Sequence, residues 1–298
     1  MGRADLGEGV RTLSSTGVSV ESQRPEYELG DEEFRFLASF LSRQTGIVLS
    51  DHKRQMVCGR LVRRLRALHL NSFTEYCDLL KGPEAEAELE HVVNAITTNI
   101  TQFFREPHHF IHLHDHVLQP IAAEKPRRRR VRLWSAGCSS GEEPHTIAMV
   151  AADVFKPGDG RDVLILATDI DTNMLAKGAA GLYDAEAAQS IPETYRKRYV
   201  RRVAHAPDKI QIAEEAHDLI RFKQLNLMGA WPMKGPFDAI FCRNVAIYFD
   251  KPTQRALFNR YADLLAMGGY FYLGHAESLI GVSDRFEVAD KTVYRRIR

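Results

Sequence analysis

Between residues 131 and 273, short apolar runs of strand length alternate with stretches that have the periodicity of helices. The apolar runs lie at 131–134, 162–167, 220–223, 237–241 and 270–273. Helical patterns occupy 144–155, 173–180 and 253–267, and Gly268 and Gly269 are placed to end the last helix just before a strand. This alternation predicts an α/β fold, in which helices cover both faces of a parallel sheet.

The chain before this alternation, residues 26–100, has a helical pattern. Apolar residues at 34, 37, 40 and 41 share one helix face, and Gly46 sits where a C-terminal cap belongs. A second helix is expected from about 51 to 70, a capping box at 72–75 opens a third, and Pro83 begins a fourth. We therefore expect a small all-α N-terminal domain. Residues 1–25, where apolar residues are sparse and aperiodic, are expected to be a disordered tail.

Two further segments complete the expected organisation. Residues 101–130 are predicted to be a linker helix that ends in the basic run 127–130, and the α/β domain then spans 131–298. Residues 183–222 are too long for a plain connection and contain Pro192 and Pro207 among β-like pieces, so they are expected to form an inserted small β-subdomain.

Composition argues against several classes of protein. No run of about 18 apolar residues exists, so neither a transmembrane helix nor direct membrane insertion is expected, and the polar N-terminus lacks a signal-peptide core. The expected location is the cytoplasm. Lys and Arg number 40 against 39 Asp and Glu, which disfavours a generic nucleic-acid binder. The four cysteines form no C-x-x-C pair, which argues against a disulfide framework or a cysteine zinc site.

Histidines crowd the segment 108–116. His108, His112 and His116 recur every four residues, which places them on one helix face with the potential to bind a metal. The segment lacks an H-E-x-x-H pattern, so solvated or packing histidines are the expected interpretation and no metal is predicted.

A glycine-containing turn, residues 135–144, follows the first strand of the α/β domain. This is where open α/β sheets bind nucleotide-like ligands. Neither the dinucleotide fingerprint nor the Walker pattern is present, because only Gly137 and Gly141 occur and no Gly-Lys-Ser/Thr follows. Glu142 and Glu143 would repel phosphate but tolerate a cationic ligand such as S-adenosylmethionine. An ordinary tight turn is the alternative.

The second strand ends in Thr168-Asp-Ile-Asp171. An acidic residue about 30 positions after the glycine turn suits the two hydroxyls of an adenosine ribose, which makes Asp169 a candidate ligand contact. The alternative is a structural one, in which Asp171 caps the helix predicted at 173–180.

Four separate motifs carry a family resemblance. They are Thr97-Thr-Asn-Ile-Thr-Gln-Phe-Phe-Arg-Glu106, Trp134-Ser-Ala-Gly-Cys-Ser-Ser-Gly-Glu-Glu-Pro144, Thr168-Asp-Ile-Asp171, and Phe237-Asp-Ala-Ile-Phe-Cys-Arg-Asn244 with Tyr248-Phe-Asp250. In this order they resemble the bacterial chemotaxis receptor methyltransferases, the CheR family, over residues 30–298. The resemblance implies a protein-glutamate O-methyltransferase that uses S-adenosylmethionine to methylate chemoreceptor helices in chemotaxis adaptation. It also implies a helical domain before a Rossmann-like methyltransferase domain with an inserted β-subdomain.

The resemblance also implies a set of cofactor-binding residues: Asn99, Thr101, Arg105, Gly137, one or both of Glu142 and Glu143, Asp169, Asn226, Leu227, Arg243 and Asn244. A glutamate acceptor is already ionised at pH 7, so methyl transfer to it needs positioning and no general base. Arg105 and Tyr248 are the candidate catalytic residues that orient it. Because a bidentate arginine would quench the nucleophile, we expect Arg105 to hold one oxygen or the cofactor carboxylate. A structural ion pair, for example with Glu106, is the alternative.

The predicted second helix is strongly basic, with six Lys or Arg and one Asp between residues 51 and 69. Receptor methylation helices are rich in Glu, so this helix is a candidate docking face through Lys53, Arg60, Arg63, Arg64 and Arg66. A solvated basic face is the alternative. Aromatic residues do not interleave with the charges, which disfavours nucleic acid.

The expected partners are therefore receptor methylation helices, and the β-subdomain could also tether a receptor C-terminal tail by adding a strand at its edge. A monomer is expected. Two other functions remain open: the same fold acting on another acceptor, and a non-catalytic S-adenosylmethionine-binding signalling module.

Overall fold

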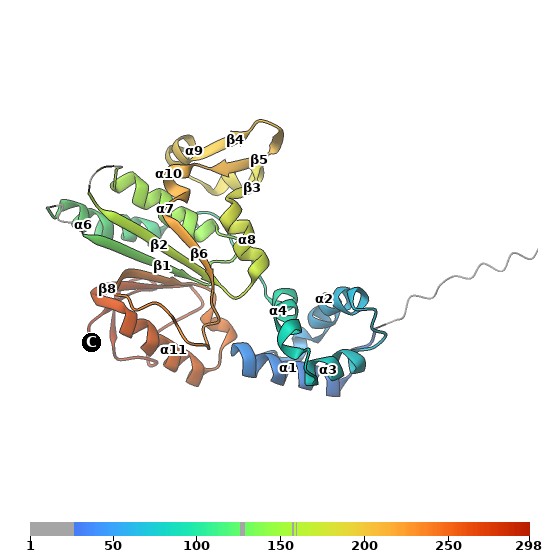
Figure 1. Cartoon of the computed structure of the whole chain (residues 1–298). Coiled ribbons are helices and arrows are strands. Elements are labelled where there is room, and N and C mark those ends of the chain that lie inside the picture. The colour runs from blue at the N-terminus through green and yellow to red at the C-terminus, as the bar shows by residue number, and fades with distance from the viewer. Residues whose placement is uncertain (1–26, 126–128, 157, 159) are drawn as a thin grey trace, which may run out of the picture.

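The computed structural model describes residues 27–125, 129–156, 158 and 160–298. The predicted tail at 1–25 and residues 127 and 128 of the basic run lie outside these residues. The described chain forms a small helical domain, an α/β domain and a smaller β-subdomain that projects from it (Figure 1). None of its helices is long and apolar enough to cross a membrane.

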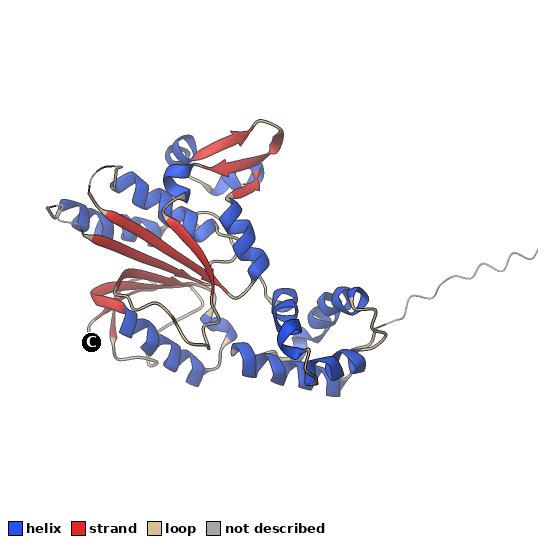
Figure 2. Cartoon of the chain, in the orientation of Figure 1, coloured by secondary structure: helices blue, strands red, loops and turns tan. Residues whose placement is uncertain are grey.

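A seven-stranded sheet is the frame of the α/β domain (Figure 2). Its order is β6 (Ile220–Gln224), β2 (Asp162–Asp169), β1 (Arg130–Ala136), β7 (Phe237–Cys242), β8 (Leu265–Leu273), β10 (Val293–Arg296) and β9 (Phe286–Asp290). The first five strands are parallel, which confirms the predicted α/β class. The order reverses between β1 and β7, so the carboxyl ends of these strands open a crevice there.

The last two strands form an antiparallel hairpin that the sequence pattern did not reveal. Most of β9 is exposed, in the pattern of an edge strand, so its residues lack the continuous apolar run that marks a buried parallel strand.

Helices cover both faces of the sheet. One face packs against α7 (Glu142–Val154) and against a helix made of α5 (His108–His112), the π-helical η2 (Leu113–Leu118) and α6 (Gln119–Ala123). The other face packs against α11 (Lys251–Leu264). Because Leu113 and Leu118 are fully buried in the same core as β1 and α7, the segment predicted as a linker helix is part of the α/β domain.

One predicted helix end is wrong. The helix expected at 253–267 ends at Leu264, and Gly268 and Gly269 lie inside β8. A Cβ on Gly269 would lie 3.0 Å from the Asp238 carbonyl oxygen of β7. Gly269 therefore permits close approach of the neighbouring strand, which is a role of glycine in strands as well as at helix ends.

The inserted β-subdomain has its own three-stranded antiparallel sheet in the order β3-β5-β4. It comprises β3 (Leu182–Asp184), η3 (Ala185–Ser190), α9 (Glu193–Tyr199), β4 (Val200–Val203), β5 (Ala206–Ile212) and α10 (Glu214–His217). The predicted boundary at 222 is too late, because β6 pairs with β2 in the main sheet.

The N-terminal domain contains the four predicted helices, α1 (Asp31–Thr45), α2 (Arg54–Ala67), α3 (Phe73–Lys81) and α4 (Ala85–Ile96), with a short 3-10 turn η1 (Asp51–Lys53) before α2. Gly46 has φ 74° and ends α1, and the Ser72 hydroxyl accepts a hydrogen bond from the Glu75 amide at the start of α3. Its apolar faces form a separate core. The domain can therefore keep its shape while its edge borders the α/β crevice.

Candidate functional site

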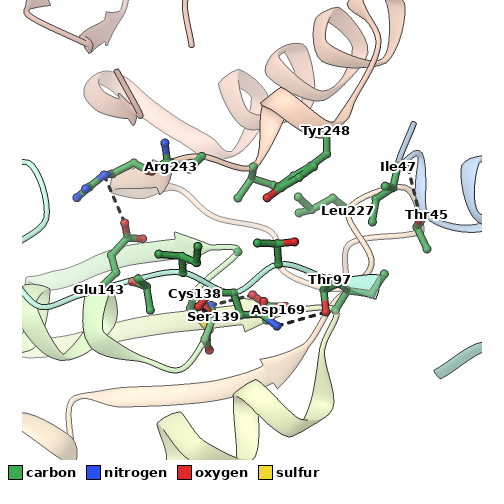
Figure 3. Close-up of a pocket in the computed structure, with 18 of the residues that line it drawn as sticks. Thr45, Ile47, Thr97, Cys138, Ser139, Glu143, Asp169, Leu227, Arg243 and Tyr248 are labelled. Atoms are coloured by element: carbon green, nitrogen blue, oxygen red, sulfur yellow. Dashed lines mark hydrogen bonds and ion pairs between the residues drawn. The ribbon is translucent and has the colours of Figure 1, made fainter. Parts of the chain in front are cut away.

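A pocket lies where the helical domain meets the carboxyl ends of the central strands (Figure 3). Its wall includes α1 and α2 on one side and the glycine turn after β1, the ends of β2 and β7, and the segment after β6 on the other. All predicted cofactor residues except Glu142 line this pocket, and so does Tyr248. The structure thus brings together residues that are up to about 150 positions apart in the chain.

The glycine turn takes its shape from contacts with the end of β2. Gly137 has φ 85°, and its amide donates to the Thr168 carbonyl oxygen at 2.8 Å. The amide of Ser139, itself at φ 49°, donates to Asp169 Oδ2 at 2.8 Å. A Cβ on Gly137 would lie 2.3 Å from Val245 Cγ2 on the opposite wall. A side chain at position 137 would therefore be strained and would also crowd the pocket.

The two aspartates of the second motif have different roles. Asp171 caps α8 (Thr172–Ala180) by accepting the amides of Asn173 and Met174, which confirms the structural alternative for this residue. Asp169 instead borders the pocket with 8% of its surface exposed. Burial raises the pKa of its carboxyl group, although hydrogen bonds from the Asp171 and Ser139 amides oppose the rise. Two backbone amides thus hold the Asp169 carboxylate in place at the edge of the pocket.

Glu142 and Glu143 also differ in their position relative to the pocket. Glu143 lines the pocket, accepts the Ser135 hydroxyl at 2.7 Å, and lies 3.6 Å from Arg243 Nε. Glu142 is not among the lining residues and accepts the Ser140 hydroxyl at 2.7 Å. Burial raises the pKa of both carboxyl groups. Of the two candidates, Glu143 is the one in position to meet a ligand in this pocket.

Arg243 sits between two carboxylates with 2% of its side chain exposed. Its Nε lies 3.6 Å from Glu143 and 3.8 Å from Glu106, and its guanidinium packs 5.4 Å from the Phe110 ring centroid. It also donates to the Arg105 carbonyl oxygen. Nε and Nη1 nevertheless have no hydrogen-bond partner within the described chain. Two buried donors beside the pocket are therefore left for a ligand group or a water.

Arg105 and Tyr248 border the same pocket, although their segments are about 140 positions apart in the chain. Arg105 donates to the Ile100 carbonyl oxygen at 3.1 Å, and no carboxylate in the described ranges forms an ion pair with it. Glu106, the predicted alternative partner, contacts His275 and Arg243 instead. The Tyr248 side chain points into the pocket beneath α11, and burial raises its pKa (Figure 3).

Some of the residues predicted to contact the cofactor also form hydrogen bonds with other residues of the protein. Asn99 donates to Asp171 Oδ2 at 2.8 Å, and its carbonyl oxygen accepts the Ser139 hydroxyl. Asn226 donates to the Gln44 carbonyl oxygen at 2.6 Å and thereby connects the end of α1 to the segment after β6. Both side chains shape the pocket in addition to any contact they make with a ligand.

The contribution of the helical domain to the pocket was missed by the sequence analysis. Ile47, Leu49 and Met56 form an apolar wall, and Lys53 Nζ lies 5.3 Å above the Tyr248 ring. The Val48 amide donates to the Tyr248 carbonyl oxygen at 2.9 Å. No local motif marks these residues, because they reach the pocket only through the docking of one domain on the other.

The basic residues of α2 are not equivalent. Arg64 forms a bidentate pair with Glu88 at 2.7 and 2.6 Å, and this buried carboxylate also accepts the Tyr76 hydroxyl. Arg60 donates to the carbonyl oxygens of Ile96 and Thr97 at the end of α4. Arg60 and Arg64 therefore hold the helical domain together, whereas the exposed Arg63 and Arg66 are available to a partner.

Part of the histidine segment packs inside the protein, as expected. His112 is buried, stacks on His116 and lies 2.9 Å from the Tyr272 hydroxyl. Ligand atoms of Glu106, His108 and His109 gather within 4.8 Å of one another. The Arg243 guanidinium, 3.8 Å from Glu106, would repel a metal ion there.

Comparison with known proteins matches both domains. Residues 32–97 match the family model described as CheR methyltransferase, all-alpha domain, and residues 99–295 match CheR methyltransferase, SAM binding domain. A probable chemotaxis protein methyltransferase of Rhizobium etli is 42% identical over 84% of this chain and 94% of its own length. Chemotaxis protein methyltransferases of Salmonella typhimurium and Escherichia coli are each 40% identical, over 95% and 89% of this chain and 96% and 91% of their own lengths.

Proposed function

The chain belongs to the CheR methyltransferase family and is an S-adenosylmethionine-dependent methyltransferase, and we propose that it methylates glutamate side chains on chemoreceptors. The observation that carries the proposal is a pocket lined by two buried carboxylates, Asp169 and Glu143, together with Arg105 and Tyr248. We further propose that the protein acts in the cytoplasm as a monomer.

The residues of the pocket fit S-adenosylmethionine. Burial raises the pKa of Asp169 and Glu143, which means that their surroundings in the protein disfavour their negative charge. A ligand that carries an ammonium and a sulfonium relieves this cost, whereas a phosphate would add to it. Asp169 would accept the ribose hydroxyls, and Glu143 would face the positively charged part of the ligand. The unpartnered donors of Arg243 and the guanidinium of Arg105 can receive its carboxylate.

When bound, S-adenosylmethionine supplies a methyl group activated by its sulfonium. The protein's task is then to bring an ionised glutamate to that group, exclude water and hold the carboxylate in line. Tyr248 donates its hydroxyl proton in a hydrogen bond to one carboxylate oxygen, and Arg105 orients either that group or the cofactor carboxylate. A single hydrogen bond leaves the attacking oxygen nucleophilic. No residue has to remove a proton, since an exposed glutamate has a pKa near 4.3.

The acceptor is proposed to be a glutamate on a receptor methylation helix that docks beside the pocket. Arg63 and Arg66 project from α2, while Lys53 on the preceding turn reaches the pocket wall itself. A Glu-rich helix would thus meet positive charge along α2 and place one carboxylate near Tyr248. The β-subdomain offers strand edges at β3 and β4, which we propose as a site for a receptor tail.

The experiment that tests this function uses tritiated S-adenosylmethionine and purified receptor cytoplasmic domains. Base-labile label on the receptor is expected, because a glutamyl methyl ester hydrolyses in alkali. The control is a receptor domain whose candidate glutamates are replaced by aspartate, which lacks one methylene of reach. Label on another acceptor would refute receptor methylation, and cofactor binding without any transfer would refute catalysis.

A further inference from the structure

We propose that the turn at residues 274–277, which follows β8, positions both Arg105 and Tyr248, and that Glu277 is its principal positioning residue. The inference rests on the proposed function, because it assumes that these two residues orient the acceptor. Glu277 itself does not line the pocket, so it acts through the segments that do.

The Glu277 carboxylate accepts backbone amides from the segment that leads to Tyr248. Oε1 accepts Val245 at 3.0 Å and Ile247 at 3.3 Å, whereas Oε2 accepts Asn244 at 2.8 Å. Oε2 also accepts the amide of Gly274 at 2.7 Å. Only 8% of Glu277 is exposed, and no Lys or Arg in the described ranges pairs with it. A buried negative charge is thus satisfied by backbone amides of one pocket wall.

This wall packs closely against the turn. Asn244 has φ 60°, a left-handed conformation that asparagine adopts more readily than most other non-glycine residues. A Cβ on Gly274 would lie 2.5 Å from Asn244 Nδ2, so the turn and the wall pack with no room for a side chain at 274. Asn244 and Val245 line the pocket, and η4 (Ala246–Tyr248) carries Tyr248 into it. Holding the amides of Asn244, Val245 and Ile247 therefore fixes the starting point of the Tyr248 side chain.

The same turn reaches the opposite wall through His275. The amide and Nδ1 of His275 lie 3.2 and 3.0 Å from Glu106 Oε1. Glu106 has φ 57° and directly follows Arg105, whose carbonyl oxygen accepts Arg243. One four-residue turn therefore restrains two segments that are about 140 positions apart in the chain, and each of them carries one acceptor-orienting residue.

The central test replaces Glu277 by glutamine. Glu277→Gln keeps the size of the side chain but turns a donor toward amides that need an acceptor. We expect kcat for receptor methylation to fall on the order of 100-fold, as for a misplaced catalytic group. The KM for the receptor domain and the Kd for S-adenosylhomocysteine, measured by calorimetry, should change much less. Amide hydrogen exchange in 244–247 should accelerate about tenfold or more, while that of β7 stays unchanged.

Two further variants keep the proposal refutable. Glu287→Gln removes an exposed carboxylate from β9 and is expected to leave kcat and exchange unchanged. His275→Ala removes a side chain that is 66% exposed, so it should fold normally and lower kcat several-fold. Wild-type kcat and unchanged exchange in Glu277→Gln would overturn the proposal, and if that variant does not fold, wild-type kcat in His275→Ala would do so. A wild-type protein that labels no receptor refutes the proposed function instead, and the exchange measurement still tests Glu277.

Discussion

Glu142 and Glu143 provide a matched pair for testing the cofactor site, because they are adjacent, acidic and buried to similar degrees, yet only Glu143 lines the pocket. We predict that Glu143→Gln weakens S-adenosylhomocysteine binding and that Glu142→Gln does not. Both substitutions keep the side-chain volume and remove one negative charge. Any difference between them therefore reports the direction in which each carboxylate faces.

The expected magnitude follows from the contacts. A hydrogen bond to a charged group contributes about 1.5–3 kcal/mol, which corresponds to roughly a 10- to 150-fold rise in Kd for Glu143→Gln. For Glu142 the contact at risk is the Ser140 hydroxyl at 2.7 Å, and a glutamine oxygen can accept the same proton. We therefore expect its Kd to stay within about threefold of the wild-type value.

Stability has to be measured alongside affinity. Glu143 is one of two carboxylates beside the buried Arg243, so Glu143→Gln leaves that guanidinium with Glu106 at 3.8 Å. This loss should cost about 1–3 kcal/mol in the free energy of unfolding. Calorimetry well below Tm isolates binding from this effect. Equal Kd values for the two variants, or a larger loss in Glu142→Gln, would refute the placement of Glu143 at the ligand.

Three further predictions follow from the structure. Arg105→Ala should lower kcat/KM about 100-fold or more while thermal unfolding stays within a few degrees, since the Arg105 side chain has only the Ile100 carbonyl oxygen as a hydrogen-bond partner in the described chain. Near-normal turnover in the methyl-transfer assay would contradict this prediction. Replacing both Arg63 and Arg66 by glutamate should raise the receptor KM about 5- to 30-fold and leave the Kd for S-adenosylhomocysteine unchanged. Arg64→Ala should instead lower Tm, because it leaves Glu88 buried without its ion-pair partner. An equal loss of cofactor binding in the double variant would exclude a docking role. Burial lowers the pKa of His109, His112 and His145 to about 2, 4 and 3. The unfolded chain therefore binds more protons than the folded one below pH 6.5, and each histidine removes up to about 1.4 kcal/mol of stability per pH unit as the pH falls from 6.5 toward its folded pKa. A Tm that does not fall between pH 6.5 and 5 would show that these side chains are not neutral in the fold.

The arrangement of elements was largely readable from the sequence. The alternation of apolar runs and helical periods predicted the parallel part of the sheet, because buried strands and amphipathic helices have different periods. Helix ends were also local: Ser72 and Gly46 mark them through contacts made within a few residues. The sequence pattern did not predict the hairpin of β9 and β10, since an exposed edge strand has no apolar run.

The chemistry of the site was only partly readable. The motifs around Gly137 and Asp169 predicted a pocket at the carboxyl end of the sheet, because parallel strands bring such turns to one edge. They could not separate Glu142 from Glu143, since the direction of each side chain depends on how α7 packs on the sheet. They also could not show that Arg64 pairs with Glu88, a contact between helices.

The strand and helix pattern, the glycine turn and the family to which the chain belongs could be identified from the amino-acid sequence, because they depend on local periodicity, chain stiffness and short motifs. The folded chain was needed to show which acidic and basic side chains face the pocket, that α1 and α2 close one side of it, and that Glu277 holds the segment before Tyr248. Burial, and with it the energy of a charge or hydrogen bond, depends on neighbours that are distant in the chain.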